Sequence, residues 1–133
     1  MGSPHTDAVV EHLAAVRAAL EQVHPEDGED TVRRLRGARD ALDDALNEAM
    51  AQAALAGSSF RAVADMAGVA PNSVAPRLAR TASLGGYGDP YGRVTAVGVQ
   101  RARYDHQEGR KPSAPAEPLR FRRRENRGKQ DPS

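Results

Sequence analysis

The stretch SSFRAVADMAGVAPNSVAPRLARTA (residues 58–82) decides the fold that the sequence predicts. Its spacing predicts two short helices joined at Gly68, because glycine can adopt the positive φ at which a helix often ends. The small Ala64 lets the two helices approach closely, and Ser58 or Ser59 can cap the first helix. Valines at helical spacing close a small core between the helices: Val63, Val69 and Val74.

A proline restricts where the second of these helices can begin. A helix that started at Pro71 would have Pro76 in its interior, where the missing N–H removes a hydrogen bond. If Ser73 caps the helix instead, Pro76 falls in the first turn, where that N–H is not needed. The sequence therefore predicts a helix from Val74 to about Ser83.

The spacing of the alanine, the glycine and the valines resembles the helix-turn-helix of bacterial DNA-binding regulators, over residues 57–83 only. The resemblance implies double-stranded DNA as the partner, and a homodimer whose two second helices enter the major groove about one helical turn apart. Arg77 departs from the pattern, since an apolar residue is usual there and Leu78 has to substitute for it. We expect the serines and Arg61 to hold phosphates, and Asn72 and the later arginines to reach base edges. The expected DNA-contacting residues of this segment are Ser58, Ser59, Arg61, Asn72, Ser73, Arg77, Arg80 and Thr81.

The composition limits the other possibilities. The 133 residues include no cysteine and no tryptophan, so the core must come from alanine, valine and leucine, and a disulfide framework is excluded. No apolar run near the start is long enough for a signal peptide or a membrane span, and we expect a cytoplasmic protein without a membrane partner.

Charge is distributed unevenly and suggests three segments. The net charge of +1 combines −6 over residues 1–56, +2 over 57–83, 0 over 84–108 and +5 over 109–133. We expect an acidic helical hairpin at 1–56 that packs or dimerises, the helix-turn-helix with a following loop and helix at 57–108, and a basic tail at 109–133.

The expected hairpin has one short and one long helix. The first is predicted to run from Thr6 or Asp7 to about Val23, and the second from a cap at Glu29 or Asp30 to Ala56, roughly 40 Å at 1.5 Å per residue. Because the second helix is the longer, either the helix-turn-helix or a second chain must cover part of its apolar side. That predicted buried side consists of Val32, Leu35, Leu42, Leu46, Met50 and Ala53.

Two segments follow the helix-turn-helix. Tyr87 and Tyr91, in a glycine-rich loop, are expected to pack at the edge of the core or to contact a sugar-phosphate backbone. Residues 93–99 allow a strand, but a helix capped by Thr95 is favoured. The tail from Gly109 has no periodic apolar face and is expected to be disordered when alone, either solubilising the protein or contacting DNA. The expected tail contacts are Arg120, Arg122, Arg123 and Arg124.

The sequence offers little for catalysis. Its four histidines are scattered, and no local motif suggests a metal site or a nucleophilic triad, so we expect no enzyme activity, cofactor or small-molecule ligand. The predicted fold is all-α: a helical hairpin with a long second helix, a helix-turn-helix, a short C-terminal helix and a disordered tail. The predicted function is sequence-specific DNA binding as a transcriptional repressor or a plasmid or phage accessory factor. The alternative is a helical protein-interaction module whose basic tail binds nucleic acid without sequence preference.

Overall fold

The computed structural model describes residues 4–109, and the prediction of an all-α fold is confirmed for that part of the chain. Five α-helices follow one another, with short 3-10 turns before and after the fourth, and the described residues form no strand. The helices are α1 (Pro4–Glu21), α2 (Gly28–Leu55), α3 (Phe60–Ala67), α4 (Val74–Leu78) and α5 (Ala96–Glu108); the 3-10 turns are η1 (Pro71–Ser73) and η2 (Gly85–Tyr87).

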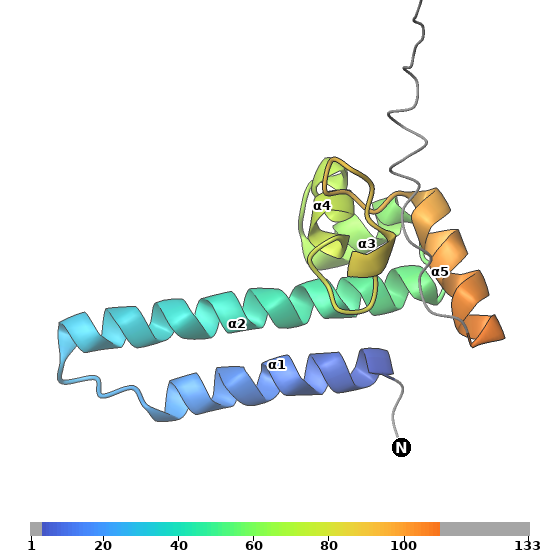
Figure 1. Ribbon diagram of the computed structural model, residues 1–133. Coiled ribbons are helices and arrows are strands. Elements are labelled where there is room, and N and C mark those ends of the chain that lie inside the picture. The colour runs from blue at the N-terminus through green and yellow to red at the C-terminus, as the bar shows by residue number, and fades with distance from the viewer. Residues whose placement is uncertain (1–3, 110–133) are drawn as a thin grey trace, which may run out of the picture.

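Helices α1 and α2 form the expected antiparallel hairpin (Figure 1). The cap of α2 differs from the prediction: the carboxylate of Asp27 accepts the Asp30 N–H at 3.1 Å, so the helix begins earlier and its first-turn acids interact favourably with the helix dipole. The hydroxyl of Thr31 donates to the His24 carbonyl at 2.8 Å and closes the connecting turn. The hairpin is therefore held by local bonds at its tip as well as by packing along its length.

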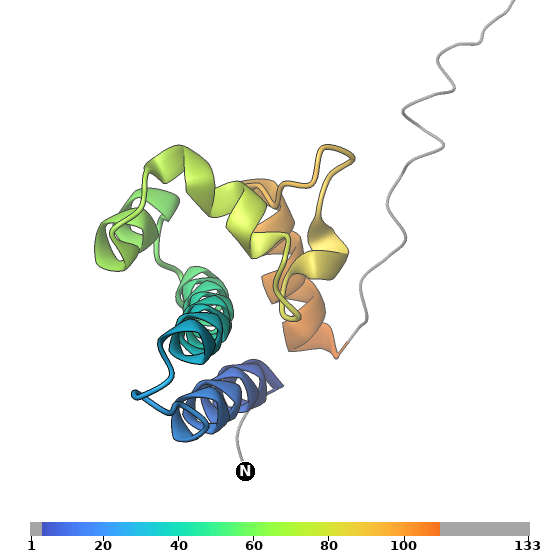
Figure 2. The ribbon, with the colours of Figure 1, turned by 90° about the vertical axis from the view of Figure 1, so that its left-hand side faces the viewer.

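The other helices gather over the C-terminal half of α2. Viewed along α2 in Figure 2, α1 lies below it, while α3, α4 and α5 arch over its other side. Helices α3, α4 and α5 and the loops that join them form what we call the folded unit (residues 59–108). The prediction of which α2 residues are buried was wrong for Val32, Leu35 and Leu42, which are exposed because the folded unit does not reach them. The core consists of Met50, Ala51, Ala54, Val63, Ala64, Val74, Leu78, Leu84, Val94, Val99 and Ala102.

The loop after α4 returns along that helix before α5 begins. The N–H of Val94 donates to the Ala75 carbonyl at 2.9 Å, which fixes the loop beside α4. Thr95 then caps α5 through the Gly98 N–H, so the helix favoured over a strand is present. Space is tight at Gly98, since a Cβ at that position would lie 3.0 Å from the Tyr87 carbonyl oxygen, which would have to shift by a few tenths of an ångström.

Candidate nucleic-acid interface

Helices α3 and α4 and the turn between them form what we call the α3–α4 unit (residues 59–78). A few local hydrogen bonds determine the conformation of its turn. The hydroxyl of Ser59 caps α3 by accepting the Ala62 N–H at 3.1 Å. Gly68 ends the helix in the left-handed region at φ 71°, and the Val69 N–H then donates to the Ala64 carbonyl at 3.0 Å. Because Ala64 is fully buried, its small side chain permits the close approach of the two helices.

Helix α4 is shorter than predicted. It runs from Val74 to Leu78 rather than to about Ser83, and Ser73 makes no capping bond because its hydroxyl donates to the Ala70 carbonyl. Thr81 explains the early end: its hydroxyl donates to the Leu78 carbonyl at 2.7 Å and accepts the Leu84 N–H at 3.0 Å, so these bonds take the place of the next helical turn. Pro76 lies within the short helix, as expected.

The structure separates the predicted DNA-contacting residues by exposure. The side chains of Ser59, Arg61, Asn72 and Arg80 are exposed, and Ser58 and Ser73 are half-buried. The expectation that Thr81 is exposed was wrong, because only 4% of it is accessible and its hydroxyl is bonded internally. The tail residues lie outside the described part of the chain: Arg120, Arg122, Arg123 and Arg124.

Arg77 is half-buried and bonded to α2 instead of projecting freely. Its Nη1 lies 3.0 Å from Oδ1 of Asp43 and 3.0 Å from Oδ1 of Asn47. This explains why arginine stands where the helix-turn-helix pattern has an apolar residue: α2 presents polar acceptors at this point. Glu48 extends the same polar row of α2, and its buried carboxylate accepts the Ala82 N–H and the Ser83 hydroxyl. We call Asp43, Asn47 and Glu48 the acceptor row.

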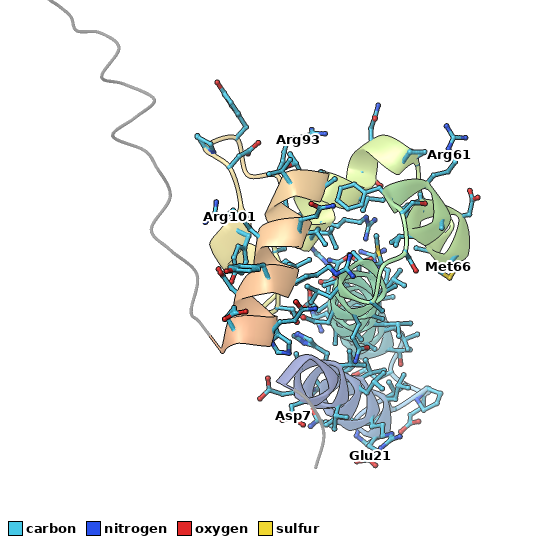
Figure 3. The ribbon with its side chains drawn as sticks, turned by 90° about the vertical axis from the view of Figure 1, so that its right-hand side faces the viewer. Asp7, Glu21, Arg61, Met66, Arg93 and Arg101 are labelled. Atoms are coloured by element: carbon cyan, nitrogen blue, oxygen red, sulfur yellow. The ribbon has the colours of Figure 1, made fainter. Side chains whose placement is uncertain are left out.

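Several arginines of the folded unit form no ion pair with a carboxylate of the described residues, and three of them lie in the α3–α4 unit or in the loop after it. Among the described residues no carboxylate pairs with Arg61, Arg80 or Arg93, and all three side chains are exposed. Figure 3 shows Arg61 and Arg93 on the side of the molecule away from α1. The acidic Asp7 and Glu21 lie on the opposite side, on α1 itself. The side bearing the arginines can attract an anionic polymer, while the hairpin repels it.

Arg93 lies in a loop tip that the sequence did not connect with the site. One carboxylate oxygen of Asp89 accepts the N–H groups of Tyr91 and Arg93 at 2.9 and 3.0 Å, and the Asp89 N–H donates to the Arg93 carbonyl at 2.7 Å. Tyr91 is 85% exposed at this tip, so the expectation that it packs at the core edge was wrong, and contact with a sugar-phosphate backbone stays a prediction. The signal in the sequence was the aspartate that opens the turn.

Tyr87, in contrast, does pack at the edge of the core. Its hydroxyl donates to Oδ2 of the buried Asp105 at 3.1 Å, and the guanidinium of Arg101 lies 5.7 Å from its ring centre. Burial, and then the hydrogen bond to Asp105, raise the pKa of the Tyr87 hydroxyl above 10. Tyr87 therefore joins the loop to α5.

The described residues contain no group of three or more histidine, aspartate or glutamate side chains placed to hold a metal ion. None of the helices between residues 4 and 109 has the length and apolar character needed to cross a membrane. Comparisons with protein-family models, with curated proteins and with solved structures found no match to this chain.

Proposed function

We propose that this chain is a sequence-specific, helix-turn-helix DNA-binding protein that acts as a homodimer, as a transcriptional repressor or as a plasmid or phage accessory factor. The proposal depends on one observation: Arg61 and Arg93 lie on the side of the folded unit that faces away from the acidic hairpin. Neither arginine pairs with a carboxylate of the described residues. Unpaired arginines suit phosphates and guanine edges, and cost no existing ion pair on binding.

The groups available to distinguish bases are few under this proposal. Asn72 precedes α4 and Arg80 follows it, and both are exposed. Arg77 would have to leave Asp43 and Asn47 before it could contact a base, so we assign it to holding α4 in place. Specificity then depends mainly on Asn72 and Arg80, and Arg61 and Arg93 supply phosphate contacts.

A second function is favoured by the shortness of α4. A helix of five residues whose Val74, Ala75 and Leu78 are buried offers little surface to a major groove. The hairpin would in that case bind a protein, and the basic tail would bind nucleic acid without sequence preference. The two proposals differ in where the binding energy for DNA resides.

Selection of bound sequences from a random pool of duplex DNA, with the full chain, separates the two proposals. Sequence-specific binding predicts one recovered motif, and Asn72→Ala or Arg80→Ala should weaken binding to it about 10-fold, at roughly 1–3 kcal/mol per base contact. Arg61→Ala should instead weaken binding to every sequence and lower the slope of log K against log salt by about 0.9.

Arg33→Ala is the matched control, because Arg33 is also an exposed arginine but lies on α2 and pairs with Glu29. It should leave both the motif and the salt slope unchanged. Recovery of no motif, with affinity unaffected by Asn72→Ala and Arg80→Ala, would refute specific binding and support the second function.

A further inference from the structure

Helix α2 carries an apolar stripe whose N-terminal part is not covered by any other described residues, while Leu46 and Ala53 near its C-terminal end pack partly against the core. Its members recur at alternating spacings of three and four residues, the pattern of a coiled-coil seam. Val32, Leu35 and Leu42 are exposed, Leu46 is only partly buried, and one charged residue, Arg39, interrupts the row. The full stripe is Val32, Leu35, Arg39, Leu42, Leu46, Ala49 and Ala53.

This stripe is separate from the face of α2 that packs on α1. Ala38 and Ala45 are buried on the hairpin, and each directly precedes a residue of the stripe (Arg39 and Leu46). Asn47 and Met50 are buried under the folded unit, and each directly follows a residue of the stripe (Leu46 and Ala49). The stripe therefore runs between α1 and the folded unit, and its N-terminal part, from Val32 to Leu42, is exposed. At its C-terminal end it opens into a hollow of about 160 Å³ between α2 and α3, lined in part by Leu46, Ala49 and Met66.

The charges along the stripe change sign near its middle. Arg36 and Arg39 lie in the N-terminal part, and Asp40 and Asp43 follow directly. Two parallel copies of α2 would align like charges with one another, whereas two antiparallel copies align arginines with aspartates. The larger side chain of Val32 would then also meet the small side chain of Ala49 at the other end of the stripe.

We propose that two copies of this chain pair through this stripe, with their α2 helices antiparallel and the two-fold axis passing between Asp40 and Ala41. In this register Leu35 of each copy faces Leu46 of the second copy, and Val32 faces Ala49 of the second copy beside the hollow. Arg39 of each copy lies opposite Leu42 and Asp43 of the second copy. The inference deepens the dimeric part of the proposed function by naming the surface and the orientation.

The spacing of the two folded units agrees with this arrangement. The core residues Met50 and Ala54 lie about 10 and 13 residues from the axis, so at 1.5 Å per residue the two units are separated by roughly 30–40 Å along α2. One turn of B-DNA spans about 34–36 Å between half-sites. Since Arg61 and Arg93 lie on the side opposite α1 (Figure 3), a two-fold axis directed from α1 towards that side leaves both basic sides facing the same way.

Because the chain has no cysteine, introduced cysteines report the register directly. The full chain carrying Leu35→Cys and Leu46→Cys should form a covalent dimer on mild oxidation, since these positions face each other across the interface. Leu35→Cys alone should not, because its two copies are separated by roughly 16 Å along the helix, beyond the reach of a disulfide. Efficient crosslinking of Leu35→Cys alone would show a parallel pair and overturn the proposal.

Light scattering of the full chain without DNA gives the second measurement. The wild type should have twice the monomer mass of 14.2 kDa, and Leu42→Glu should raise the dimer dissociation constant at least 100-fold. Val97→Glu is the control, since Val97 is 72% exposed on α5, against 54% for Leu42, and lies away from the stripe. Circular dichroism checks that both variants remain helical.

The outcomes separate this inference from the proposed function. A monomer at all concentrations, or a dimer equally affected by both glutamate variants, overturns the interface even if the protein selects a DNA motif. A dimer with the expected crosslinks that selects no motif supports the interface and refutes specific DNA binding.

Discussion

Replacement of Arg77 by alanine should lower the stability of the fold, whereas replacement of Arg80, three positions later, should leave it almost unchanged. In Arg77→Ala, Oδ1 of Asn47 loses its donor; because Asn47 is 3% exposed, water cannot replace that donor, which costs about 1–3 kcal/mol. The Asp43 side chain is 46% exposed and can regain water, so the lost ion pair adds less than about 1 kcal/mol. We therefore expect the free energy of unfolding to fall by about 1–4 kcal/mol.

Arg80→Ala is the comparison, because Arg80 is exposed and has no partner among the described residues. Its free energy of unfolding should change by less than about 0.5 kcal/mol, while DNA affinity falls. Urea unfolding followed by circular dichroism, at one fixed protein concentration, measures both variants. An unchanged urea midpoint for Arg77→Ala, or equal losses for the two variants, would refute the reasoning that Arg77 holds α4 on α2.

Three further replacements test the local structure. Gly68→Ala should lower the free energy of unfolding by about 1–2 kcal/mol, because φ is 71° at that position. Gly37→Ala should instead raise it by up to about 1 kcal/mol, because Gly37 lies inside α2 and a Cβ there meets no other atom. Urea unfolding of the two variants measures both changes. Glu48→Ala should lower the free energy of unfolding by about 1–2 kcal/mol, since it leaves the Ala82 N–H without its acceptor; a midpoint like the wild type's would contradict this. The pKa of Tyr87 is raised in the folded protein, so its protonated form stabilises the fold below pH 10 and this stability is lost as pH rises through the folded pKa. Unfolding curves between pH 8 and 11 should therefore show a smaller loss of stability for Tyr87→Phe than for the wild type.

The elements that sequence predicts well here are those with local causes. The caps at Ser59 and Thr95, the glycine end of α3 and the hairpin all depend on residues within a few positions of one another. Even the cap of α2, predicted at Glu29 or Asp30, lies at the neighbouring Asp27. These choices require no knowledge of tertiary contacts.

The length of α4 and the state of its side chains could not be predicted in this way. Thr81 ends the helix because Leu84 enters the core and brings its N–H to the threonine hydroxyl. Arg77 is turned inward because Asp43 and Asn47, about 30 positions earlier in the chain, face it across the helix contact. Sequence periodicity assigns both residues to an exposed face, and only the packing of α4 on α2 shows otherwise.

The acceptor row of α2 explains how the two halves of this molecule are joined. An apolar face at Asp43, Asn47 and Glu48 would hold α4 with less desolvation cost, but it would also tolerate sliding of the short helix. Directed bonds to Arg77 and to the segment after α4 instead fix one position of that helix along α2. If the stripe on the adjacent side of α2 binds a second copy, the same helix determines both the orientation of each α3–α4 unit and the distance between the two. Under the proposed function, a dimer needs both quantities fixed to recognise two half-sites on DNA, and this one helix would supply both.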